Sequence, residues 1–341
     1  MQPWCRSLPV RASLAAVLVV FLPACGGDGV VTPAPVPVSN DIAAGTAVTV
    51  ISGETKRPVV GARVVVAGRS YTTDGAGEVR LEAAVLRGSL VDVVAPGYFD
   101  RQTTLRDPGP ARFALWPKAS ATGLDEQTTA ELVYTQGAFC CPANALANAP
   151  LRRVAPTIGS FDLVLDARYG DNSLVRDVIQ EAASLAGRAA GARVVFNPAD
   201  TSGGSRIDIT SGPDPENRPN VAAFTEWRLD AFGYITGGRI VFVLDDYLRG
   251  RQSRRVLTTI MTHELGHVLG LGHSSAPGVM SVYQGVGTNY AFFAAAGDFS
   301  PAEKLVLDLM YDRRGGTRFP DNDRVAALTS GGRLERIVCR F

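Results

Sequence analysis

At 341 residues the chain is long enough for about two domains of ordinary size. It is 46% hydrophobic and 20% charged, a composition typical of globular proteins with packed cores. The net charge of +1 excludes a general electrostatic affinity for nucleic acid, and we expect no nucleic-acid partner. Outside the N-terminus, no apolar run has the length of a membrane-spanning helix.

The N-terminal residues have the pattern of an export signal. Two arginines precede the apolar stretch 12–22, and small residues follow it. The junction LPACG at 22–26 resembles a bacterial lipobox. This resemblance implies that residues 1–24 are a lipoprotein signal peptide. The mature chain is then exported to the bacterial cell envelope and anchored through lipid on Cys25, in the outer membrane or at the cell surface. An ordinary signal peptide with an incidental Cys25 also fits, and it too places the mature protein outside the cytoplasm.

Two regions of different character follow the signal. Residues 25–40 are rich in Gly and Pro without a helical or strand period, and we interpret them as a semi-extended tether. Residues 41–117 show short Val-rich segments separated by turn sequences, which predicts an all-β sandwich. The expected strands lie within residues 46–51, 61–68, 77–83, 89–95 and 111–116.

The β region also resembles a known domain type. The stretch GETKRPVVGARVVVAGRSYTTDGAGEVRL at 53–81, followed by APGYFDRQTTLR at 95–106, is similar to carboxypeptidase regulatory-like domains. Because the matching residues are mainly turn and core positions, the resemblance implies a fold and no activity. Two roles stay open: a spacer or stabilising module, and a module that binds a partner or cell-wall material.

Residues 118–341 change to an α/β pattern. The spacing of apolar residues predicts an amphipathic helix over 172–191, and a second helix is expected from about Ser253 to Leu269. Ser300, Pro301 and Glu303 form a capping box at the start of a third helix. Strands are expected at 161–167, 192–199, 205–211, 220–229 and 238–246. This order describes an α/β (α+β) domain built on one main mixed sheet.

Three cysteines remain in the predicted mature domains: Cys140, Cys141 and Cys339. In an oxidising compartment Cys339 could pair with either of the other two, which leaves one free thiol. Three unpaired buried cysteines fit the sequence equally well.

All three histidines of the chain fall in one window, THELGHVLGLGH at 262–273. His263 and His267 are four residues apart, so on a helix they share a face and can bind one metal ion. Glu264 points to the side, where it can reach a metal-bound water without being a ligand. H-E-x-x-H on a helix is the zinc-protease pattern.

The spacing of the window continues past the helix. Gly270 can end the helix in a left-handed conformation, and the turn lets His273 supply a third nitrogen. Three protein ligands leave zinc an open position, which is the arrangement of catalytic sites. A structural site would normally have a fourth protein ligand, and it gives no reason for Glu264. A chance H-E-x-x-H is disfavoured because the extended form fixes five positions.

The window HELGHVLGLGHS resembles the active-site helix of metzincin metalloproteases, and its residue sequence is most similar to that of the matrixin branch. SSAPGVMSVY at 274–283 is similar to the methionine turn of that family, which implies Met280 as a hydrophobic floor beneath the metal. The resemblance covers about residues 160–315. Tyr283 stands three residues after the methionine, one more than the zinc-proximal tyrosine of astacin-like relatives, so we assign it no catalytic role.

Taken together, the motif implies a zinc endopeptidase. Zinc on His263, His267 and His273 activates water and polarises the scissile carbonyl, and Glu264 acts as general base. The protein or peptide substrate is expected to pair with an edge strand. Residues 220–229 are the candidate for that edge, on position in the family order alone.

Other functions also fit the sequence. The chain could instead be an anchored adhesion or binding protein with a binding β-sandwich and an inactive protease-like domain, although all four site residues are present. The substrate could be a cell-wall peptide or the protein's own chain. We expect one zinc per chain, because no histidine is left for a second site. Acidic loops at 166–172 and 211–217 make calcium possible, but their spacing does not support it.

Overall fold

The computed structural model describes residues 41–134, 150–199, 204–215, 217, 221–281, 297–324 and 334–340, the last segment by its backbone. Predictions on the signal peptide, the tether, Cys25, Cys140, Cys141 and Tyr283 lie outside the described residues. Asn40–Phe341 form one compact unit. The division of this unit at residue 117 into two domains stays a prediction.

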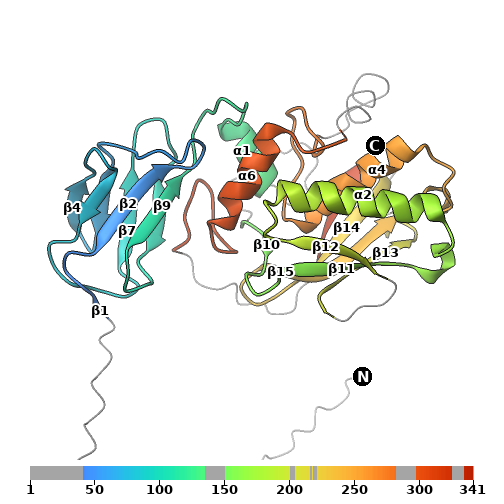
Figure 1. Ribbon diagram of the computed structural model, residues 1–341, viewed down its shortest axis with the longest axis horizontal. Coiled ribbons are helices and arrows are strands. Elements are labelled where there is room, and N and C mark those ends of the chain that lie inside the picture. Colours follow the sequence, from blue (N-terminus) through green and yellow to red (C-terminus); the bar gives the residue numbers. More distant parts are fainter. Residues whose placement is uncertain are drawn as a thin grey trace, which may run out of the picture. The chain divides into compact units, whose positions relative to one another are not determined.

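The N-terminal part of this unit is all β, as the sequence predicts (Figure 1). One sheet has the strand order β5-β2-β9 and a second has the order β4-β3-β7-β8, while β1 pairs with β6. Alternating valines of β2, β3 and β7 point into one apolar core between the sheets. The strands are β1 (Asp41–Ile42), β2 (Ala47–Ser52), β3 (Arg63–Val66), β4 (Arg69–Thr72), β5 (Glu78–Arg80), β6 (Val85–Leu86), β7 (Leu90–Val94), β8 (Arg101–Thr104) and β9 (Ala111–Leu115).

A mixed sheet follows, with the order β12-β11-β13-β15-β14-β16, and β10 also pairs with β15. Strands β10 to β13 run parallel to their partners and β14 runs antiparallel to β15. The strands are β10 (Arg153–Val154), β11 (Ser160–Leu165), β12 (Val195–Ala199), β13 (Arg206–Ser211), β14 (Val221–Leu229), β15 (Tyr234–Phe242) and β16 (Leu334–Arg340). The predicted mixed α/β sheet is therefore confirmed.

The prediction that residues 220–229 form an edge strand was wrong for this sheet. Strand β14 pairs with β15 on one side and antiparallel with β16 on the other. The partner comes from the far C-terminus of the chain, more than a hundred residues after β14. Such pairing depends on long-range chain closure, which the local pattern of a strand does not encode.

The helices match the sequence prediction closely. Helix α2 (Ser173–Ala189) is capped by Asn172, and helix α4 (Arg254–Val268) is capped by Ser253. These two helices pack against each other over the mixed sheet (Figure 1). Helix α6 (Pro301–Tyr311) carries the predicted capping box. Two helices that the sequence did not predict are α1 (Glu126–Tyr134) and the short α3 (Asp245–Leu248).

None of the helices in the described part of the chain is long and apolar enough to span a bilayer.

Candidate metal centre

Helix α4 presents His263 and His267 from one face, one turn apart. Both rings are buried, and each Nδ1 donates to a backbone carbonyl: His263 to Val279 at 2.6 Å and His267 to Leu271 at 2.7 Å. Because a carbonyl only accepts, the proton of each neutral ring lies on Nδ1. The two Nε2 atoms are 3.1 Å apart and carry the lone pairs. The backbone thus fixes the tautomer in which both rings present a metal-binding nitrogen.

The third histidine reaches the same point through a sharp turn. Gly270 follows the helix with φ of 104°, and a Cβ there would lie 2.2 Å from the carbonyl oxygen of Arg152. Only glycine fits this combination of backbone angle and close approach. The chain then returns and places the His273 ring centroid 5.2 Å from that of His263 and 4.8 Å from that of His267.

The electrostatics of the cluster favour neutral imidazoles. Burial lowers the pKa of His263 to about 4 and that of His273 to about 3. Burial, followed by the charges of the other two rings, lowers the pKa of His267 well below its ordinary value. At neutral pH all three rings are therefore uncharged, which is the form that binds a metal ion.

The donor set fits zinc. One nitrogen from each of the three histidines lies within 4.8 Å of the others, and in the described part of the chain this is the one such group of three or more possible ligands. Three converging neutral imidazoles suit a borderline-soft ion such as zinc, whereas oxygen-rich sites suit calcium or magnesium. The Nε2 atoms of His263 and His267 lie 3.1 Å apart, and in this tautomer neither carries a proton. Their lone pairs therefore repel each other, and a cation bound between them removes this repulsion.

Glu264 is fully buried next to the histidines, at 0% exposure. The Thr225 hydroxyl donates to its Oε2 at 2.6 Å. Trp227, two residues along β14, donates from Nε1 to the backbone carbonyl of His267 at 2.8 Å. The middle of β14 is therefore fastened to α4 at Glu264 and at the backbone of the zinc-ligand candidate His267.

The methionine turn closes the site from the other side. Met280 is fully buried, and a Cβ on Gly266 of α4 would lie 2.3 Å from its Sδ. The carboxylate of Glu303, at the start of α6, accepts from the backbone N–H of Met280 at 2.7 Å and of Ser300 at 2.6 Å. Burial raises the pKa of Glu303. One side chain thus caps a helix and holds the turn that contains Met280.

Sequence reasoning found the three histidines, Glu264 and Met280 but missed the groups that hold them. Thr225 looked like an ordinary strand residue, and Glu303 was recognised only as a helix cap. The single available signal was for Glu303: a capping box that starts shortly after a methionine turn places its carboxylate near that turn. Thr225 offered no such signal, because its contact with Glu264 joins two elements that are distant in sequence.

Comparison with known families agrees with this geometry. Residues 187–304 match the family model of the matrixins. The matched range begins in α2 and ends in α6, so it includes α4, the three histidines and Met280. No curated protein matches the chain.

Proposed function

We propose that this chain, which carries a matrixin metalloendopeptidase domain with its three-histidine zinc site, is an exported, lipid-anchored enzyme of the bacterial cell envelope. The observation that carries the catalytic part is the convergence of His263, His267 and His273 beside a buried glutamate. All the groups that peptide hydrolysis at a zinc centre requires are present, which argues against an inactive, purely adhesive protein.

In the proposed reaction His263, His267 and His273 hold the zinc ion. Zinc supplies Lewis acidity toward the scissile carbonyl and toward water. Glu264 accepts the proton of the attacking water and returns it to the leaving amine. The Thr225 hydroxyl on Oε2 holds the carboxylate in one orientation, so that proton transfer always starts from the same geometry. Met280 supports the centre from below.

A peptide library tests the catalytic proposal. The full mature chain is incubated with mixed peptides, with a chelator, and with chelator followed by zinc. We expect internal cleavage that the chelator stops and zinc restores. A zinc-loaded chain that binds cell-wall material through its β-sandwich but cleaves no peptide would instead favour the adhesion protein.

The anchor rests on the LPACG junction at 22–26 and on the Gly/Pro-rich residues 25–40 behind it. A lipid on Cys25 and a semi-extended tether would hold the folded part of the chain away from the membrane surface, with the β-sandwich as a spacer. Intact mass of the mature N-terminus tests this. A diacylated or triacylated Cys25 supports the anchor, and an unmodified N-terminus at or beyond residue 25 makes the enzyme a freely secreted one.

A further inference from the structure

Strand β14 lies directly beside the proposed catalytic centre. Thr225 in the middle of this strand bonds to Glu264, and Trp227 bonds to the helix that carries the zinc ligands. An extended peptide that pairs with the outer edge of β14 passes next to the general base. Main-chain pairing with an open strand edge is a common way for proteins to hold extended peptides.

Strand β16 occupies this edge. It runs antiparallel to β14, and its register places Ile337 opposite Thr225. Opposed residues of an antiparallel pair have Cα atoms about 4.5 to 5.5 Å apart. The backbone of β16 therefore passes within one strand spacing of the residue that orients Glu264. Its pairing extends in both directions, from Leu334 opposite Arg228 to Arg340 opposite Val221.

We infer that the chain's own C-terminal segment is a substrate-like occupant of the β14 edge, which a peptide substrate has to displace. This inference rests on the proposed endopeptidase function. Strand β16 is the last strand of the sheet order, so within the described residues its backbone pairs on one side only. The strand can leave without breaking any other pairing of the sheet, and β14 then becomes the open edge that substrate binding requires.

Removal of the residues after Arg324 tests whether β16 competes with the substrate for the β14 edge. The mature chain that ends at Arg324 is compared with the full mature chain on one peptide substrate, with zinc content measured for both. If β16 occupies the β14 edge in about nine molecules of ten, only about one molecule in ten is open to substrate, so the apparent affinity for substrate falls about tenfold. We therefore expect KM to fall about tenfold with kcat nearly unchanged. A synthetic 334–341 peptide added to the truncated chain should restore the higher KM, and a scrambled peptide should not.

Two single proline variants give a matched control in case truncation unfolds the chain. Successive N–H groups of an edge strand point alternately toward and away from its partner. Of Ile337→Pro and Val338→Pro, one should therefore break the pairing and lower KM while the other leaves KM unchanged. Equal KM in all variants with zinc bound would show that β16 does not compete with the substrate, and would overturn this inference alone. Zinc-loaded variants that all fail to cleave would instead overturn the proposed function.

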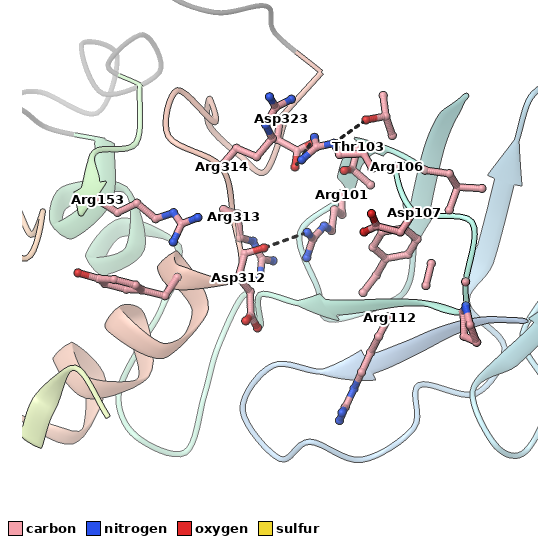
Figure 2. Close-up of a pocket in the computed structure, with 17 residues that line it drawn as sticks. Arg101, Thr103, Arg106, Asp107, Arg112, Arg153, Asp312, Arg313, Arg314 and Asp323 are labelled. Carbon is pink, nitrogen blue, oxygen red and sulfur yellow. Dashed lines mark hydrogen bonds and ion pairs between the residues drawn. The ribbon is translucent and has the colours of Figure 1, made fainter. Parts of the chain in front are cut away.

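A second feature, separate from the β14 edge, is a cavity of about 320 Å³. It is lined by residues of β8, β9, β10 and the segment after α6. Its guanidinium groups outnumber its carboxylates. The arginines are Arg101, Arg106, Arg112, Arg153, Arg313 and Arg314. The acidic residues are Asp107, Asp312 and Asp323. Figure 2 shows Arg153 pointing toward Asp312 and Arg313 from the opposite side of the cavity.

Three of these arginines have a buried donor nitrogen without a hydrogen bond among the described residues, and that of Arg106 forms an ion pair with Asp323 at 3.4 Å. Arg101 is 5% exposed; it donates to the carbonyl of Ala114 at 2.8 Å, while its buried Nε has no hydrogen bond. Arg153 lies over the rings of Tyr234 and Tyr311, at 5.2 and 5.6 Å from their centroids, and its buried Nε also has no hydrogen bond. Stacking uses the faces of a guanidinium and leaves its in-plane donors available.

The geometry points to a binding site for a phosphate or sulfate group in this cavity. An oxyanion with two negative charges would offset part of the excess positive charge and accept hydrogen bonds from in-plane guanidinium donors. Burial, followed by the charge of Arg313, lowers the pKa of Arg101 to about 10. The site does not involve the metal centre, so its occupancy is a property separate from catalysis.

Binding is measured on the full mature chain by thermal unfolding and calorimetry, with inorganic phosphate, glycerol 3-phosphate, or chloride at matched ionic strength. We expect saturable stabilisation by phosphate and at least ~tenfold weaker binding in Arg153→Gln. Arg251→Gln, which changes an exposed arginine paired with Asp246, is the matched control and should bind normally. Tighter binding of the phosphomonoester would identify a larger phosphorylated ligand. Stabilisation that chloride reproduces, or that Arg153→Gln leaves intact, would overturn the site.

Discussion

The metal centre and the outer edge of β14 meet at Glu264, yet they are built in opposite ways. Residues 263–281 supply all three histidines, Glu264 and Met280 from one short stretch of chain, and backbone carbonyls within that stretch orient two of the rings. The edge is built from β14 and β16, which join Val221–Leu229 to Leu334–Arg340. The first region is local and buried, and the second is long-range and lies at the end of a sheet.

The local region determines the chemistry of the site, and the long-range region determines whether a substrate can reach it. A local motif can specify the metal and the base, because a helix and the turn behind it fix the spacing of their side chains. Long-range strand pairing then decides what lies along the edge of β14. Changes in the first region should therefore affect zinc and kcat, whereas changes at the edge should affect KM.

His267→Ala should give the largest effect and tests whether the centre needs every ligand. Its Nε2 faces that of His263, and its carbonyl accepts from Trp227. We expect the variant to lose tightly bound zinc and all measurable cleavage. Elemental analysis after dialysis measures the metal. A variant that retains both would show that zinc binds elsewhere.

Glu303→Gln should have an intermediate effect, because it acts on the site through the methionine turn. An amide offers one acceptor oxygen where the carboxylate accepts from the N–H groups of Met280 and Ser300. Leaving a buried donor unpaired costs about 1 to 3 kcal/mol. We expect a lower Tm and weaker zinc retention. Glu181→Gln removes an exposed carboxylate of α2 and is the control; equal effects of the two changes would mean that the contact with the turn is unimportant.

Thr225→Val tests both regions at once, because Thr225 belongs to β14 but contacts the proposed base, Glu264. Valine keeps the shape and removes the hydroxyl that donates to Glu264. A hydrogen bond to a charged group contributes about 1.5 to 3 kcal/mol, so kcat should fall at least about tenfold. KM and zinc content should stay the same. A change confined to KM would assign Thr225 to the edge and not to the base.

Lys56→Ala should have the smallest effect and sets the background for the other variants. Lys56 pairs with Asp308 on the surface, and both side chains are partly exposed. Exposed ion pairs contribute about 0 to 1 kcal/mol. We expect a small change in Tm and none in kcat or KM. A large kinetic effect would show that the site responds to remote surface changes.

The sequence predicted what depends on nearby residues. The periodicity of residues 172–191 and the caps at Ser253 and Ser300 predicted α2, α4 and α6 closely, since each signal lies within its own helix. It could not predict that Thr225 meets Glu264, or that β16 covers β14. Those contacts form only when the sheet closes, and many pairings of short apolar strands satisfy the same local pattern.

The proposed mechanism makes Glu264 the base and the three histidines the zinc ligands. Glu264→Gln tests it most directly, with zinc content and peptide cleavage measured on the same preparation. We predict one zinc per chain, as in the unsubstituted protein, and a loss of at least about a hundredfold in rate. Near-normal turnover with zinc bound would remove Glu264 from the mechanism, and loss of the zinc would make Glu264 a ligand.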